Sequence, residues 1–168
     1  ATKYKVYRNT VDNSSSASDI SGEITGTSFE DTTVLPGITY YYWTEAGCDN
    51  GWSDFSDSDS GYEQLSVPTD VSASDGVYTN KVKITRTASS GATKYKVYRN
   101  TVDNSSSASD ISGEIAGASF EDTTVLPGIT YYYWTEAGCD NGWSDFSDSD
   151  NGYAKLSTPL NIFATDGT

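Results

Sequence analysis

The chain has 168 residues, enough for one large domain or for two β-sandwiches of about 90 residues each. Its 24 acidic residues outnumber its 10 basic ones and it contains no histidine, so its formal net charge is −14 at pH 7. This charge repels nucleic acid and anionic membranes, and neither is expected as a partner.

The chain repeats itself almost completely. Residues 1–65 align with residues 92–156 without a gap, so the period is 91 residues. The two copies are identical at 60 of 65 positions and differ only at 25/116, 27/118, 60/151, 63/154 and 64/155. Near-identity at domain length is typical of a tandem array of one module. An enzyme seldom needs two copies of one site in succession, and the usual general base is absent without histidine, so we expect no enzymatic activity.

In the first copy, residues Lys3 to Arg8 alternate between polar and apolar side chains, as a half-buried strand does. A Ser-rich loop follows at residues 12–19. The turn signal Pro36-Gly37 then runs into aromatic and β-branched residues with no helix-forming interruption, which predicts a strand entered through a tight corner. The segments expected to be extended are 1–8, 20–24, 28–29 and 38–46.

Residues 67–91 precede the second copy and contain two further expected strands, 71–74 and 81–86. The expected strands 95–99 and 129–137 then repeat those of the first copy. The side chains expected to form the core are Val82, Ile84, Tyr95, Val97, Phe120, Val125, Tyr131 and Tyr133.

The spacing Val125-x-Pro127-x-x-x-Tyr131, which both copies carry, resembles the loop-and-strand signature of fibronectin type III domains. The resemblance implies that the Tyr131 hydroxyl bonds to the main chain just upstream, as a tyrosine corner that pins the preceding loop. It also implies an all-β fold of tandem fibronectin type III-like β-sandwiches, in which the first sandwich lacks its A and B strands.

The resemblance and the repeat together divide the chain into three parts. Residues 1–66 are a partial repeat with strands C to G, and residues 67–157 are a complete repeat. Residues 158–168 are the first strand of a further repeat, because 160–168 match 69–77. A half-sandwich exposes a long edge. Either a neighbouring chain lends the missing strands by β-augmentation, or the chain belongs to a longer polymer.

The expected strand 81–86, which corresponds to strand B of the family, departs from the family pattern. The family usually carries a core Trp two residues after the position of Ile84, where this chain has Arg86. A buried Arg needs a carboxylate or an aromatic face. Either the local core differs from that of the family, or this strand is frayed.

Alternation along the expected strand 129–137, which corresponds to strand F of the family, points Tyr131 and Tyr133 inward and leaves Tyr132 and Trp134 on the outside. Exposed aromatic clusters stack on sugar rings or anchor protein interfaces. The alternative is that they form cross-strand pairs covered by Lys side chains such as Lys96. Repetition at a fixed spacing favours a protein interface over a glycan ligand. The candidate binding or interface residues are Tyr7, Tyr41, Trp43, Tyr98, Tyr132 and Trp134.

Carboxylates supply the oxygen atoms that calcium prefers, so calcium is a weak candidate for a bound ion. No other cofactor is expected. The alternative is that solvated acidic loops keep a long array soluble. Asn13 and Asn104 begin Asn-Ser-Ser tripeptides, which fit the N-glycosylation acceptor pattern. Cys48 and Cys139 occupy equivalent positions in the two repeats, so each is either a free thiol or part of a cross-link between domains or chains. The calcium candidates are Asp54, Asp57, Asp59, Asp145, Asp148 and Asp150.

These features predict a structural module of an extracellular or cell-surface fibre, stalk or adhesin shaft in a microbe, acting by self-assembly or as a spacer. Its expected partners are other copies of itself or neighbouring repeats, with a glycan or cell-surface partner as a further option and no insertion into a membrane. An alternative is a carbohydrate-binding or spacer module of a secreted polysaccharide-degrading enzyme. A third class is a calcium-dependent cell adhesion module.

Overall fold

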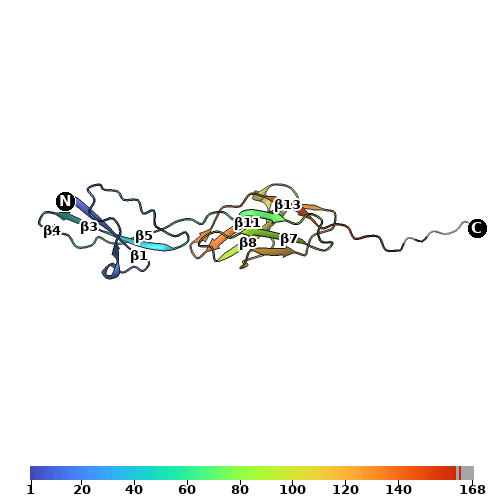
Figure 1. Ribbon diagram of the computed structural model, residues 1–168, viewed down its shortest axis with the longest axis horizontal. Coiled ribbons are helices and arrows are strands. Elements are labelled where there is room, and N and C mark those ends of the chain that lie inside the picture. The colour runs from blue at the N-terminus through green and yellow to red at the C-terminus, as the bar shows by residue number, and fades with distance from the viewer. Residues whose placement is uncertain (162, 164–168) are drawn as a thin grey trace, which may run out of the picture. The chain divides into compact units, whose positions relative to one another are not determined.

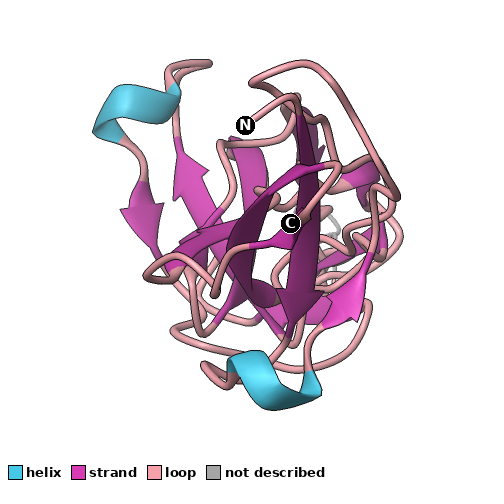
Figure 2. Cartoon of the chain, turned by 90° about the vertical axis from the view of Figure 1, so that its left-hand side faces the viewer, coloured by secondary structure: helices cyan, strands magenta, loops and turns pink. Residues whose placement is uncertain are grey.

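A computed structural model describes residues 1–161 and 163 of the chain. The chain forms two compact units, one built mainly on Ala1–Ser66 and the other mainly on Val67–Ser89, Thr93–Ala137 and the residues from Asp145 on (Figure 1). Apart from two short 3-10 turns, regular structure in the described residues consists of β-strands (Figure 2). No helix among these residues is long and apolar enough to cross a membrane.

The first unit contains a single antiparallel sheet of five strands. The central strand β3 pairs on one side with β1, and β2 extends the sheet beyond β1. On its other side β3 pairs with β4 and β5 at different points along its length. The elements are β1 (Lys3–Asn9), η1 (Ser14–Ser16), β2 (Ser18–Asp19), β3 (Thr39–Cys48), β4 (Gly51–Trp52) and β5 (Asp59–Tyr62).

The second repeat, residues 67–157, contains the equivalent five-stranded sheet and a second sheet in the order β10-β7-β6. The three-stranded sheet consists of β6 (Thr69–Ala73), β7 (Val82–Thr87) and β10 (Ser119–Asp122). The five-stranded sheet consists of β8 (Lys94–Asn100), β9 (Ser109–Asp110), β11 (Thr130–Cys139), β12 (Gly142–Trp143) and β13 (Asp150–Tyr153), and η2 (Ser105–Ser107) lies between β8 and β9.

The core of the second unit lies between its two sheets. It contains Val82 and Ile84 from β7, Val97 from β8 and Tyr133 from β11, all at 0% exposure. Seven of the eight predicted core residues are buried, and Phe120 is partly buried against the same cluster. Alternation along each strand therefore selected the interior positions correctly.

Both units contain the predicted tyrosine corner. The main-chain N–H of Leu126 donates to the Tyr131 hydroxyl at 3.2 Å, and the equivalent bond from Leu35 to Tyr40 measures 3.3 Å. The preceding Pro-Gly turn needs a positive φ, which Gly128 supplies at 82° without the steric cost of a side chain. The turn and the tyrosine corner together therefore fix the position at which strand β11 begins.

The buried Arg86 side chain packs against an aromatic ring in the second unit. Its guanidinium carbon lies 3.9 Å from the centroid of the Tyr95 ring, and its Nη2 donates to the Gly117 carbonyl. The side chain is 5% exposed, and burial lowers the pKa of Arg86. Strand β7 is regular through this position, so the strand is not frayed and the local core differs from the family pattern.

The sheet edge that follows β11 is interrupted. The two-residue strand β12 pairs with one end of β11, and the four-residue strand β13 pairs with the other. Residues 144–149 between them lie outside any strand, although the Ser147 N–H still donates to the Thr135 carbonyl at 3.0 Å. The first unit has the same interruption between β4 and β5.

One predicted element differs between the copies. The sequence Ser-Phe-Glu-Asp forms β10 in the second unit, where it pairs with β7, whereas Ser28–Asp31 in the first unit lies outside any strand. The expected segment 20–24 forms only an isolated bridge between Ile24 and Tyr4. Most of the predicted strand of a further repeat, residues 162 and 164–168, lies outside the described residues.

Candidate binding surfaces

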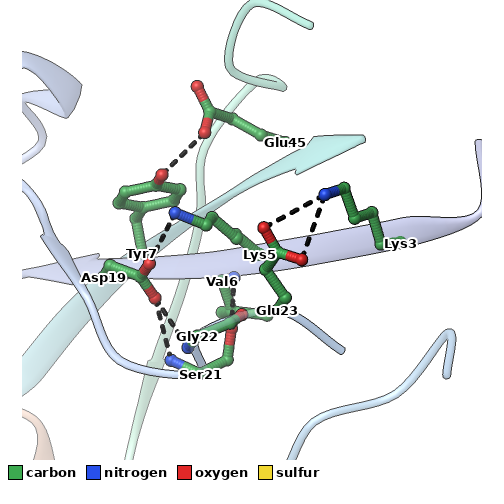
Figure 3. A network of polar contacts seen from close by, with 9 residues as sticks. All are labelled: Lys3, Lys5, Val6, Tyr7, Asp19, Ser21, Gly22, Glu23 and Glu45. Atoms are coloured by element: carbon green, nitrogen blue, oxygen red, sulfur yellow. Dashed lines mark hydrogen bonds and ion pairs between the residues drawn. The ribbon is translucent and has the colours of Figure 1, made fainter. Parts of the chain in front are cut away.

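The predicted aromatic surface of the first unit is tied to its own neighbours. Tyr7 on β1 lies opposite Trp43 on β3. The Tyr7 hydroxyl donates to Glu45 Oε2 at 2.6 Å, and this bond is the main cause that raises the pKa of Tyr7 (Figure 3). The Phe55 ring stands edge-on to the Tyr7 ring, with centroids 4.8 Å apart and an interplanar angle of 88°.

The expectation that the outward aromatic residues are exposed is wrong for the two tryptophans. Trp43 and Trp134 are each 4% exposed, while Tyr41 and Tyr132 are half-buried. Period-two alternation assigns a side chain to one face of a sheet but does not say what covers that face. Here aromatic residues that follow the strand, such as Phe55, occupy the same face.

Two lysine side chains also lie on this face. Lys3 pairs with Glu23 at 3.0 Å and Lys5 pairs with Asp19 at 3.1 Å (Figure 3). Both ammonium groups also lie over the Trp52 ring, 5.1 and 5.0 Å from its centroid. The hydrogen bond to Asp19 raises the pKa of Lys5. The ring is therefore not free to stack on a sugar from this side.

Trp52 was not among the predicted site residues, although the sequence carries a signal for it. Its ring lies on the backbone of Gly47, where an added Cβ would come within 2.8 Å of the ring. The second repeat has the same contact between Gly138 and Trp143, at 2.7 Å. A glycine inside an otherwise aromatic strand marks such a close approach.

The second unit has the same outer surface. The Tyr98 hydroxyl donates to Glu136 at 2.7 Å, and the Phe146 ring stands edge-on to Tyr98 with a centroid separation of 4.8 Å. Burial, followed by the bond to Glu136, raises the pKa of Tyr98. Lys96 pairs with Asp110 at 3.4 Å. In both units the aromatic residues are thus held in cross-strand contacts flanked by lysine, which was the alternative reading of this surface.

The acidic residues that the structure describes do not gather into a metal site. Among residues 1–161 and 163, no group of three or more His, Cys, Asp or Glu side chains is placed to hold a metal ion. Asp150, one of the calcium candidates, accepts a hydrogen bond from the Ala73 N–H at 2.7 Å and so links the two sheets of the second unit. The geometry adds no support to the calcium prediction.

The two asparagines of the predicted glycosylation sites cap the 3-10 turns, and the two cysteines are free thiols. Asn13 and Asn104 are exposed, and each side-chain oxygen accepts from the main-chain N–H of the second residue after it, at 3.1 Å. These bonds cap η1 and η2. Cys48 and Cys139 form no disulfide, and Cys48 is exposed.

An open groove lies on the other face of the sheet in the first unit, and sequence reasoning did not identify it as a site. It has a volume of about 810 Å³. Its walls come from β1, β3, β5 and the segment before β3, and they include Val6, Ile24, Phe29, Val34, Tyr42 and Tyr62. Phe29 is 39% exposed and Tyr62 is 56% exposed, so the groove presents apolar surface to solvent.

The equivalent surface in the second unit is covered. Val97, the counterpart of Val6, is 0% exposed, whereas Val6 is half-buried. Thr135 is likewise 0% exposed, whereas its counterpart Thr44 is exposed. The difference arises because β6 and β7 lie over the sheet of the second unit.

A carboxylate bound to an arginine fixes the floor of this surface in both units. Asp122 is 2% exposed and accepts from Arg99 Nη1 at 2.6 Å and from the Tyr133 hydroxyl at 3.2 Å. Burial, followed by the nearby Asp122 charge, raises the pKa of Tyr133. Asp31 keeps the equivalent 2.6 Å bond to Arg8 in the first unit. The floor of the groove is thus preformed without the covering strands.

Comparison with known proteins identifies the fold. The chain matches a two-domain fibronectin type III segment of chicken tenascin with a TM-score of 0.64 and 15% identity, over 90% of this chain and 84% of that one. A Fn3-like protein from Clostridium thermocellum is 25% identical with a TM-score of 0.48, over 58% of this chain and 98% of that one. The FN1–FN3 domains of chicken CNTN1 are 14% identical with a TM-score of 0.47, over 91% of this chain and 56% of the length of that one. No protein-family model and no curated protein matches the chain. The chain therefore has the all-β fold of fibronectin type III-like sandwiches, and the first one lacks its A and B strands.

Proposed function

We propose that the chain is a structural repeat module of an extracellular microbial fibre, stalk or adhesin shaft, which acts by self-assembly or as a spacer. The observation that carries this proposal is the repeat itself, identical at 60 of 65 positions across a domain length. Selection for a ligand site in one domain gives no reason to keep a second copy so similar. Selection for a regular array of equivalent modules does give a reason to keep two nearly identical copies.

The mechanism we propose is mechanical. Each β-sandwich protects its backbone hydrogen bonds, and the junctions Val67-Pro68 and Thr158-Pro159 limit backbone freedom because proline fixes φ. The formal charge of −14 keeps neighbouring shafts apart until cations or partners screen it. A non-enzymatic role fits the absence of histidine from the sequence.

The self-contacts of the aromatic surfaces also support a structural role. Tyr7 and Tyr98 are engaged with carboxylates of their own sheets, and the tryptophans Trp43 and Trp134 are buried. A sugar-binding platform needs accessible aromatic faces. The repetition of this surface at a fixed spacing favours an interface between modules or chains over a glycan ligand.

The experiment that tests the proposal is electron microscopy of the purified protein, with the native mass measured in parallel. Filaments or elongated particles with a regular spacing of one or two modules are expected for an array module. Compact monomers of 18.1 kDa that stay monomeric at high concentration and in millimolar calcium would contradict self-assembly. Specific, saturable sugar binding by the folded chain would point instead to the carbohydrate-binding alternative.

A further inference from the structure

We propose that the interior of the second unit binds a small inorganic anion of the chloride type, held by the Arg86 side chain. This inference does not depend on the function proposed above. It starts from polar atoms that the fold leaves unsatisfied. Nε and Nη1 of Arg86 and Oγ of Ser89 are buried, and none has a hydrogen-bond partner within the part of the chain that the structure describes. Such atoms are rare in folded proteins and indicate a bound water or ion.

The first argument is the uncompensated charge of Arg86. The other two arginines of the chain are neutralised by carboxylates, since Arg8 pairs with Asp31 and Arg99 with Asp122, each at 2.6 Å. Arg86 is 5% exposed, and no carboxylate of the described residues influences it. Burial lowers its pKa, but an arginine starts from so high a value that it stays charged at neutral pH. A charge buried in this way is costly unless an anion accompanies it.

The second argument is the position of the unsatisfied atoms around Tyr95. The guanidinium carbon of Arg86 lies 3.9 Å from the centroid of the Tyr95 ring, and the Ser89 N–H donates to the Tyr95 hydroxyl at 3.0 Å. Both residues therefore contact one side chain, which is itself 5% exposed. The Nη2 of Arg86 is already bonded to the Gly117 carbonyl, which holds the guanidinium in place. The N–H groups on Nε and Nη1 remain as donors beside the Ser89 hydroxyl.

The donor set favours an anion over a water molecule. The N–H groups of Arg86 can only donate, and a hydroxyl can donate as well as accept. A water molecule can accept some of these bonds but leaves the positive charge uncompensated, whereas an anion accepts them and neutralises that charge. The segment around Gly117 adds no side-chain hydroxyl, because Ala116 and Ala118 stand where the first copy has Thr25 and Thr27.

The enclosure of the site favours a small ion. The three unsatisfied atoms are closed off from solvent. Ser89 belongs to residues 88–93, which connect β7 and β8 and lie outside any strand. We expect the ion to enter by a small shift of this loop. A monatomic anion needs the least displacement, so chloride or bromide fits the site better than phosphate or the carboxylate of a partner protein.

The test uses the full chain and follows hydrogen exchange of β7 by mass spectrometry while chloride replaces gluconate, an anion too large for the enclosed site. Constant ionic strength keeps the screening of the net charge of −14 unchanged. The sequence of β7 occurs once in the chain, so its peptides report on the second unit alone. Its amides pair with β6 and β10, and their exchange therefore requires the unit to open.

The variant Arg86→Met replaces the charge with an apolar side chain, a change that buried charged positions often tolerate. The matched control is Lys83→Met, which removes one positive charge from the same strand but from its other face. Ser89→Ala removes one donor and leaves Arg86 unchanged.

At a chloride concentration about ten times the dissociation constant, binding multiplies the folding equilibrium constant about tenfold. Exchange of the β7 amides should slow by about that factor in the unmodified chain and in Lys83→Met, and should not respond to chloride in Arg86→Met. In Ser89→Ala the response should need about tenfold more chloride, because a hydrogen bond to a charged group is lost. In crystals grown with bromide, an anomalous peak is expected beside Nε and Nη1 of Arg86.

Equal exchange in chloride and gluconate for the unmodified chain would overturn the proposal and would assign the unsatisfied atoms to buried water. A saturable chloride response of equal size in Arg86→Met would also overturn it, because the ion would then bind elsewhere. Bromide peaks that leave the surroundings of Arg86 empty would have the same meaning. None of these results depends on filament formation, so the proposed structural function stands or falls separately.

Discussion

Replacement of Val97 with alanine should destabilise the second unit far more than the same replacement of Val6 destabilises the first. The two valines occupy equivalent positions in β8 and β1. Val97 is 0% exposed beneath β7, whereas Val6 is half-buried at the groove. The comparison holds sequence and sheet geometry nearly constant and varies only the covering strands.

The magnitude follows from the burial of the two methyl groups that the substitution removes. At about 0.8 kcal/mol for each buried group, Val97→Ala loses about 1.5 kcal/mol of transfer free energy. The cavity left between the two sheets raises the cost to about 2 to 3 kcal/mol. Val6→Ala removes surface that is already partly hydrated and leaves no closed cavity, so its cost should stay below about 1 kcal/mol.

Urea unfolding followed by circular dichroism and tryptophan fluorescence measures both effects. With an m-value of about 1 to 3 kcal/mol/M, Val97→Ala should move the midpoint of its unit by about 1 M or more. Val6→Ala should move the midpoint of the first unit by only a few tenths of the shift expected for Val97→Ala. Equal shifts for the two variants would refute the inference that β6 and β7 are what buries this surface.

Three further predictions follow from single contacts. Asp122→Ala should destabilise the second unit by about 3 to 5 kcal/mol in urea unfolding, because it leaves the Arg99 charge without its carboxylate at 2.6 Å, and a loss below about 1 kcal/mol would contradict this. Tyr131→Phe removes the hydroxyl of the tyrosine corner and should cost about 1 kcal/mol by the same assay, with an unchanged midpoint as the contrary result. The pKa of Asp31 would be raised by burial alone but is lowered overall, chiefly by hydrogen bonds from Thr33. Its stabilisation should therefore be complete above about pH 4 and be lost as the pH falls through its folded value, and a pH titration of stability in which Asp31→Asn keeps the same acid slope would disprove this.

Most of the fold that could be predicted from the sequence was predicted from the repeated segment. The spacing of Val125, Pro127 and Tyr131 led to the fold and to the tyrosine corner, and both are confirmed. Inward alternation also placed Val97 and Tyr133 correctly, because both side chains face the hydrophobic cluster between the two sheets.

The remaining features depend on contacts that a single strand does not encode. Trp43 was assigned to the outer face and expected to be exposed, but aromatic residues later in the chain lie on that face. Ser28–Asp31 and Ser119–Asp122 have identical sequences but differ in structure, because only the second has a partner strand. The groove follows from the same cause, since its walls are predictable and its openness depends on which strands cover it.

The broken edge after β3 and β11 bears on how near-identical neighbours avoid misfolding together. Adjacent domains of almost the same sequence are prone to exchange strands and to join their sheets. Here the outer edge offers a two-residue strand and a four-residue strand, separated by residues 53–58 in one unit and 144–149 in the other. No run of this edge is long enough to hold a second sheet in register. The break therefore protects this edge of each sheet against edge-to-edge pairing with another sheet.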